Sequence, residues 1–190
     1  MNKPVISSKV LEKDQIYVLF FEAATYSQEM LDLMRQIQDK KVAYVSLNKT
    51  YSTILKDLKR KSIKHENFFV IDTRSEKIET LDDTKVHNVC FLSSPAALTE
   101  LSITISHILK TNHFDYIIFD SLSTLLIYDK ETRGGIVKFT TTLMNKIKGY
   151  NIKAIFTAIE DHRNSFLVEE ACAFSDVVEE YNKISMSFIK

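Results

Sequence analysis

The sequence predicts an α/β fold, a three-layer α/β/α sandwich in which a mostly parallel sheet lies between two layers of helices. Short apolar runs alternate along the chain with segments of helical spacing. Most of these runs are continuously apolar, which is typical of strands that are buried on both faces. Strands that alternate with helices are joined by right-handed crossovers into a parallel sheet. With 190 residues, 45% of them hydrophobic, we expect a single domain over 1–190.

Six runs are expected to form strands because they are rich in aliphatic, β-branched and aromatic residues. They span 16–21, 42–47, 68–71, 86–92, 116–119 and 152–158. Four apolar stripes at helical spacing lie between them and predict core-facing helices. The stripes are Met30, Met34 and Ile37; Ile54, Leu55 and Leu58; Leu98, Leu101, Ile105 and Ile108; and Ile136, Phe139, Leu143 and Ile147.

Local signals place several boundaries. Ser94 and Pro95 are expected to open the third helix, and Gly149 to end the fourth. The polar stretch 74–85 is expected to be a surface loop. Near the end of the chain, apolar residues alternate with polar ones over 184–188, after 177–181. This pattern predicts a C-terminal antiparallel hairpin at the sheet edge.

Composition argues against several classes of partner. Lys plus Arg and Asp plus Glu number 25 each, so no net field attracts nucleic acid or an anionic membrane. No apolar run is long enough to cross a bilayer. The two cysteines, Cys90 and Cys172, lack metal-ligand spacing, which suits a reducing compartment. We therefore expect a cytoplasmic protein with no membrane partner.

The carboxyl ends of the predicted strands carry a set of polar side chains. Open parallel sheets bind ligands at this edge, so these residues predict a crevice for a ligand or a protein partner. The alternative is that they are polar only because loops face water. The candidates are Thr25, Tyr26, Asn48, Lys49, Asp120, Ser121 and Glu160.

The run at 116–126, Tyr-Ile-Ile-Phe-Asp-Ser-Leu-Ser-Thr-Leu-Leu, delivers Asp120 to the end of a buried strand. Together with the segments 42–47, 69–72 and 98–102, it resembles the KaiC-like branch of the RecA superfamily. The resemblance is closest to archaeal-type members that lack a P-loop, which carry a Tyr in the first helical turn and Leu-Asn-Lys after the second strand, as Tyr26 and 47–49 do here. It implies a RecA-like fold in which Asp120 is a degenerate Walker B residue. It also implies oligomers, with itself or with an intact KaiC-like ATPase.

The phosphate-binding part of such an ATPase is missing from the sequence. A P-loop needs glycines for close backbone approach and a Lys for the phosphates, whereas the three glycines, Gly134, Gly135 and Gly149, all follow Asp120. The segment 21–29 stands in its place with no Gly, no Lys and two acidic residues. Where the resemblance places catalytic glutamates, the chain has Asn48 and Lys49. We therefore expect no ATP hydrolysis, and neither ATP nor magnesium as a cofactor.

The leading hypothesis is a non-catalytic RecA-fold pseudo-ATPase that acts through protein–protein contacts as a regulatory, scaffold or signalling-adaptor protein. One alternative is a nucleotide or small-metabolite binding module without hydrolysis, in which Lys49 contacts phosphate. A second is a nucleic-acid-binding accessory protein that uses a basic cluster on and after the second helix, although cations near a helix C-terminus are ordinary. This cluster comprises Lys56, Lys59, Arg60, Lys61 and Lys64.

Overall fold

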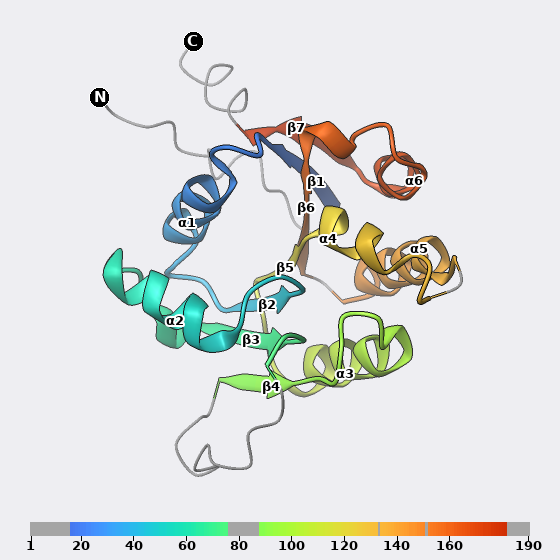
Figure 1. Ribbon diagram of the computed structural model, residues 1–190. Coiled ribbons are helices and arrows are strands. Elements are labelled where there is room, and N and C mark those ends of the chain that lie inside the picture. Colours follow the sequence, from blue (N-terminus) through green and yellow to red (C-terminus); the bar gives the residue numbers. More distant parts are fainter. Residues whose placement is uncertain (1–15, 76–87, 133, 151, 182–190) are drawn as a thin grey trace.

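A seven-stranded sheet forms the centre of the molecule, with helices on both of its faces (Figure 1). The computed structural model describes residues 16–75, 88–132, 134–150 and 152–181. The strand order is β4-β3-β2-β5-β6-β1-β7, and each of the six pairings is parallel. The strands are β1 (Ile16–Phe21), β2 (Val42–Ser46), β3 (Phe68–Asp72), β4 (Val89–Phe91), β5 (Tyr116–Asp120), β6 (Lys153–Ile159) and β7 (Val177–Glu180).

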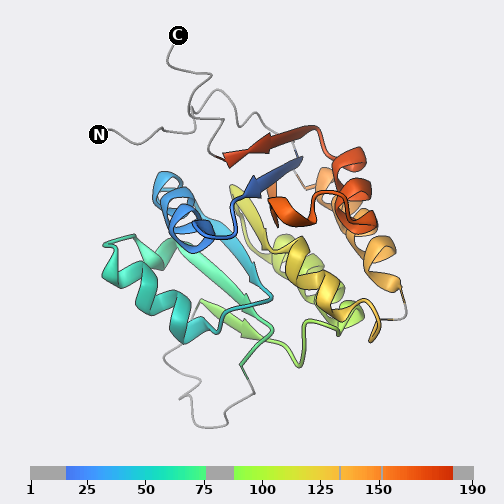
Figure 2. The same cartoon turned by 45° about the horizontal axis from the view of Figure 1, so that its top comes forward.

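The helices form two layers, which the turned view in Figure 2 also separates. Helices α1 (Tyr26–Gln36) and α2 (Tyr51–Arg60) cover one face of the sheet. Helices α3 (Leu98–Thr111), α5 (Gly135–Lys148) and α6 (Phe166–Phe174) cover the other, and the short α4 (Leu122–Leu125) follows β5 directly. No helix among the described residues combines the length and the apolar character that a bilayer span requires.

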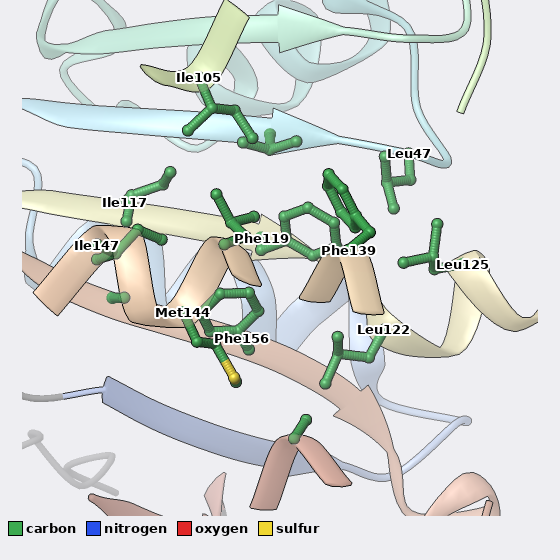
Figure 3. Packing of buried hydrophobic residues seen from close by; sticks show 14 of the residues in the cluster. Leu47, Ile105, Ile117, Phe119, Leu122, Leu125, Phe139, Met144, Ile147 and Phe156 are labelled. Atoms are coloured by element: carbon green, nitrogen blue, oxygen red, sulfur yellow. The ribbon is translucent and has the colours of Figure 1, made fainter. Parts of the chain in front are cut away.

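Each face of the sheet has its own apolar core. Under α3, α5 and α6, the Phe119 ring lies 5.4 Å from that of Phe156 and 6.2 Å from that of Phe139, measured between centroids (Figure 3). Successive side chains of a strand point to opposite faces, so Ile118 packs in the other core, under α1 and α2. Burial on both faces explains why the strands are continuously apolar.

The predicted fold class and all six predicted strands are confirmed, with bounds that shift by a few residues, although 86–87 of the fourth predicted strand lies outside the described residues. The predicted start of the third helix is wrong. It begins at Leu98, because the Ser94 hydroxyl accepts a hydrogen bond from the Ala96 N–H (3.1 Å) in a separate turn. Gly149 does follow the last residue of α5. Helices α4 and α6 were not predicted.

The last strand of the sheet, β7, is described, whereas the predicted antiparallel hairpin is described only in part. Strand β7 pairs in parallel with β1, with Tyr17 opposite Val177, because α6 provides a crossover between β6 and β7. The second arm of the predicted antiparallel hairpin, 184–188, lies outside the described residues, and so does 76–85 of the predicted surface loop. Both of these stay predictions.

Candidate functional site

Three buried polar residues line up across the carboxyl edge of the sheet. Ser46 at the end of β2 is opposite Asp120 on one neighbouring strand and opposite Asp72 on the other. All three side chains are almost fully buried. Burial of a carboxylate costs free energy unless hydrogen bonds compensate for its lost hydration. The hydrogen-bond partners of Asp120 and Asp72 therefore show what holds each carboxylate in place.

Asp120 lies at the centre of a hydrogen-bonded network on the α1/α2 face. Its Oδ1 accepts from the Tyr26 hydroxyl at 2.5 Å and from the Asn48 side-chain amide at 3.3 Å. Its Oδ2 accepts from the hydroxyl of Tyr44, in the middle of β2. Each oxygen thus has a donor from the protein itself, and Asp120 is only 1% exposed.

Tyr26 reaches Asp120 because the chain turns sharply after β1. Strand β1 ends at Phe21, and after the four residues 22–25 α1 begins with Tyr26. The Thr25 N–H donates to the Glu22 carbonyl (3.2 Å), which closes the turn. The Tyr26 ring packs edge-on against Phe21, with centroids 5.2 Å apart, and its hydroxyl also bonds the Thr157 hydroxyl at 2.7 Å. The first residue of α1 therefore covers Asp120.

The burial of this network changes the proton affinity of its members. Burial raises the pKa of Asp120, while the Tyr26 and Tyr44 hydroxyls and the positive charge of Lys49 act in the opposite direction. Burial, followed by the charge of Asp120, raises the pKa of Tyr26 and of Tyr44 well above the ordinary value. Both tyrosines therefore keep their protons at neutral pH and act as donors to the carboxyl group.

This arrangement is poorly suited to a metal ion. Magnesium prefers six oxygen ligands in octahedral geometry, and Asp120 would first have to give up the hydrogen bonds from Tyr26, Tyr44 and Asn48. In the part of the chain that the structure describes, no group of three or more His, Cys, Asp or Glu side chains is arranged to hold a metal.

The structure brings some of the predicted crevice residues together and separates others. Tyr26, Asn48 and Asp120 meet, and Ser121 next to them caps α4 by accepting from the Thr124 N–H at 3.1 Å. Thr25 is exposed in the turn before α1.

Two charged residues of the predicted crevice have other partners. Lys49 Nζ lies 3.5 Å from Asp57 Oδ2 on α2. Glu160 accepts two hydrogen bonds from Arg163, at 2.5 and 2.8 Å. Tyr26, Asn48 and Asp120 are thus joined by hydrogen bonds, whereas Lys49 and Glu160 each pair with another charged residue.

Sequence reasoning missed two members of this network, Tyr44 and Thr157. Both are polar residues in the middle of strands that are otherwise apolar and buried. A buried hydroxyl needs a hydrogen-bond partner, and both residues point to the same face as Asp120. A polar residue inside a continuously apolar strand was therefore the available signal.

Asp72, the second buried carboxylate, holds two segments of backbone. Its Oδ2 accepts from the Tyr51 N–H at 2.6 Å, in the first turn of α2. Its Oδ1 accepts from the N–H groups of Arg74 (2.7 Å) and Ser75 (3.0 Å). Asp72 therefore joins the end of β3 to the N-terminus of α2, and its role here is structural.

The predicted basic cluster lies on α2 and the residues after it, in the α1/α2 layer. Among the described residues, Arg60 Nη2 lies 2.9 Å from Asp57 Oδ1, and Lys64 Nζ lies 2.5 Å from Asp39 Oδ1, so both cations are paired with carboxylates. Lys56 and Lys59 are exposed. The positive charge at this surface is thus partly neutralised.

Comparison with known structures supports the fold. A KaiC-like protein from the hyperthermophilic archaeon Pyrococcus horikoshii OT3 superposes with a TM-score of 0.65, over 95% of this chain and 80% of that one, at 10% sequence identity. No protein-family model matches the chain, and neither does any curated protein. At this identity the similarity establishes the fold alone: the chain has the RecA-type α/β architecture of a KaiC-like protein.

Proposed function

We propose that this chain is a pseudo-ATPase, a RecA-type fold without nucleotide chemistry that acts through protein–protein contacts as a regulatory, scaffold or signalling-adaptor protein. The observation that carries the proposal is the contact between Tyr26 and Asp120. In a nucleotide-binding version of this fold, the turn after the first strand leads to phosphate, and the Asp faces magnesium. In this chain the Tyr26 phenol occupies the space in front of Asp120.

The turn between β1 and α1 supports the same conclusion. A P-loop follows the pattern GxxxxGK[ST], and its backbone N–H groups surround the phosphates. Here four residues, 22–25, connect β1 to α1, and they include neither Gly nor Lys. Glu22 adds a negative charge at the place where a phosphate would need donors.

The two alternative functions have less support from the contacts. Lys49, the candidate phosphate contact of a metabolite-binding module, lies beside Asp57 with its side chain 27% exposed. A nucleic-acid surface on α2 would rely on cations of which Arg60 and Lys64 already have acidic partners. We also propose a cytoplasmic location, because Cys90 and Cys172 lie far apart in the sequence and follow no metal-ligand spacing, which suits a reducing compartment.

An assay of ATP hydrolysis tests the proposal. We expect the purified chain to release phosphate from MgATP at the rate of a buffer control. The variant Asp120→Asn, which removes the charge that a magnesium site would need, should give the same rate as the wild type. Turnover by the wild type that Asp120→Asn abolishes would show an active site and contradict the proposal.

A further inference from the structure

Helices α3 and α5 pack side by side on one face of the sheet (Figure 1). They run in the same direction, because Leu98 and Gly135 at their starts line one hollow, of about 480 Å³, and Lys110 and Gly149 at their ends line another, of about 570 Å³. A third hollow, of about 710 Å³, adjoins them at the start of α3. We call these three hollows the α3–α5 groove.

An apolar side chain lies at the centre of the groove. Ile103 lines all three hollows and is 64% exposed. Leu98 lines two of the hollows, and Phe139 lines one. A single exposed apolar residue is ordinary on a protein surface. At the point where three hollows meet, however, it is a contact point for the apolar side chain of another molecule.

The rim of the groove is positively charged. Lys110, Lys138 and Lys146 line it, and all three are exposed. Within the described part of the chain these lysines form no ion pair. Lys146 Nζ instead lies 3.2 Å from the hydroxyl of Ser102, across the groove on α3. The lysine charges around Ile103 are therefore available to an acidic partner.

The charges also give the groove a direction. Glu100 lines it in the first turn of α3, and its carboxylate accepts a hydrogen bond from the Ser93 hydroxyl at 2.6 Å. Lys110, Lys146 and the exposed His107 line the opposite end, where α3 and α5 finish. An antiparallel helix fits this pattern, because its positive dipole end would face the C-termini of α3 and α5. Acidic side chains in its first turns would then reach the two lysines.

We propose that the α3–α5 groove binds an amphipathic helix of a different protein. An apolar side chain of this helix packs on Ile103, and its acidic residues face Lys110, Lys138 and Lys146. A groove between two helices accepts a helix through apolar anchors spaced along one face, and α3, with 14 residues, offers a seat about 21 Å long. The proposal rests on the proposed function and names the surface and the class of partner.

Fluorescence anisotropy with a labelled designed peptide tests the proposal. The peptide has 14 residues, as α3 has, with Leu at helical spacing along one side and Glu beside them in its first two turns. We expect saturable binding to the full chain at low salt, and binding that is about tenfold weaker at high salt, where charge pairs are screened. Two matched peptides, with Gln for each Glu or Ser for each Leu, should also bind about tenfold more weakly.

Two variants of the protein test the two parts of the groove. Ile103→Ser removes the apolar contact, and the double substitution Lys110→Glu/Lys138→Glu reverses the charge of the rim. Each should weaken binding of the acidic peptide about tenfold. All three positions are exposed, so both variants should fold, which far-UV circular dichroism verifies. A peptide with Lys for each Glu should bind the double variant more tightly than the wild type, because complementary charge is restored.

Lys56→Glu/Lys59→Glu is the matched control. It changes the net charge by the same amount as the double variant, at exposed positions in the other helix layer. It should bind the acidic peptide like the wild type. The orientation has its own readout: a nitroxide at the N-terminus of the peptide should broaden the amide signals of Lys110 and Gly149 more than those of Leu98.

Equal affinity for the Glu and Gln peptides would overturn the proposal, and so would affinity that Ile103→Ser leaves unchanged. Other occupants of the groove predict different results, and each of these would also overturn it. A second copy of the chain gives a dimer without peptide that Ile103→Ser dissociates. A nucleic acid gives binding of a single-stranded DNA probe that the double variant abolishes and Ile103→Ser does not affect. These measurements do not involve the Asp120 edge, so their failure is distinguishable from failure of the proposed function, which the hydrolysis of MgATP tests.

Discussion

At the scale of single residues, Asp120 is a buried carboxylate with a protein hydrogen-bond donor on each oxygen. A buried carboxylate is stable only when hydrogen bonds replace its hydration. Tyr44 from β2, Tyr26 from α1 and Asn48, two residues after the end of β2, each donate to it. We infer that these donors are what allow Asp120 to remain at a buried position.

The substitution Tyr44→Phe tests the structural role of this network. It removes the donor to Asp120 Oδ2 and leaves that buried oxygen without it. An acceptor that loses its partner in the interior costs about 1–3 kcal/mol. We expect the free energy of unfolding, measured with urea, to fall by about 2 kcal/mol.

Tyr128→Phe is the control for this substitution, because it also deletes one hydroxyl. That hydroxyl accepts from exposed Arg74 at 2.8 Å, and surface changes of this kind are usually within about 0.5 kcal/mol. Equal, small effects of the two substitutions would mean that the Asp120 network contributes little to stability.

At the scale of the elements, the N-terminus of α2 is held in two ways. The Thr50 hydroxyl accepts from the Thr53 N–H at 3.4 Å as a helix cap. Asp72 accepts from the Tyr51 N–H at 2.6 Å while it also holds the backbone that follows β3. The shorter and charged contact is the stronger one, so Asp72 is the main link between β3 and α2.

We therefore expect Asp72→Ala to destabilise the protein more than Thr50→Ala does. Removal of a buried acceptor shared by several N–H groups costs about 3 kcal/mol, whereas loss of a cap costs about 1 kcal/mol. Hydrogen exchange should become faster at the Tyr51 and Ser75 amides in Asp72→Ala. A larger loss of stability in Thr50→Ala would show that the cap, rather than Asp72, holds α2.

At the scale of the whole molecule, the sequence predicted the strands of the sheet better than the helices around it. Strands such as 116–119 were found because burial on both faces makes them continuously apolar, and this pattern survives in a single sequence. Helix α6 was missed because two of its apolar residues, Phe166 and Phe174, point outward. Its pattern therefore lacks the single stripe that identifies a core-facing helix.

The sequence predicted that the site lies at the carboxyl edge of the sheet, but it did not predict the contacts between the side chains there. Parallel topology brings Tyr26, Asn48 and Asp120 to one edge of the sheet, and this could be inferred from strand ends alone. Whether these side chains leave a crevice or fill it depends on the length and direction of the β1–α1 turn, which residue types do not reveal. Tyr44 and Thr157 were likewise not predicted as site residues, because each lies in the middle of a buried strand.

We expect that the carboxyl edge around Asp120 does not bind nucleotide, and calorimetric titration with MgATP and MgGTP tests this most directly. For the wild type we expect heats equal to those of dilution up to about 1 mM nucleotide, which corresponds to binding weaker than about −4 kcal/mol. Saturable heat with the wild type that is lost in Asp120→Asn would show that nucleotide enters this edge and would contradict the account.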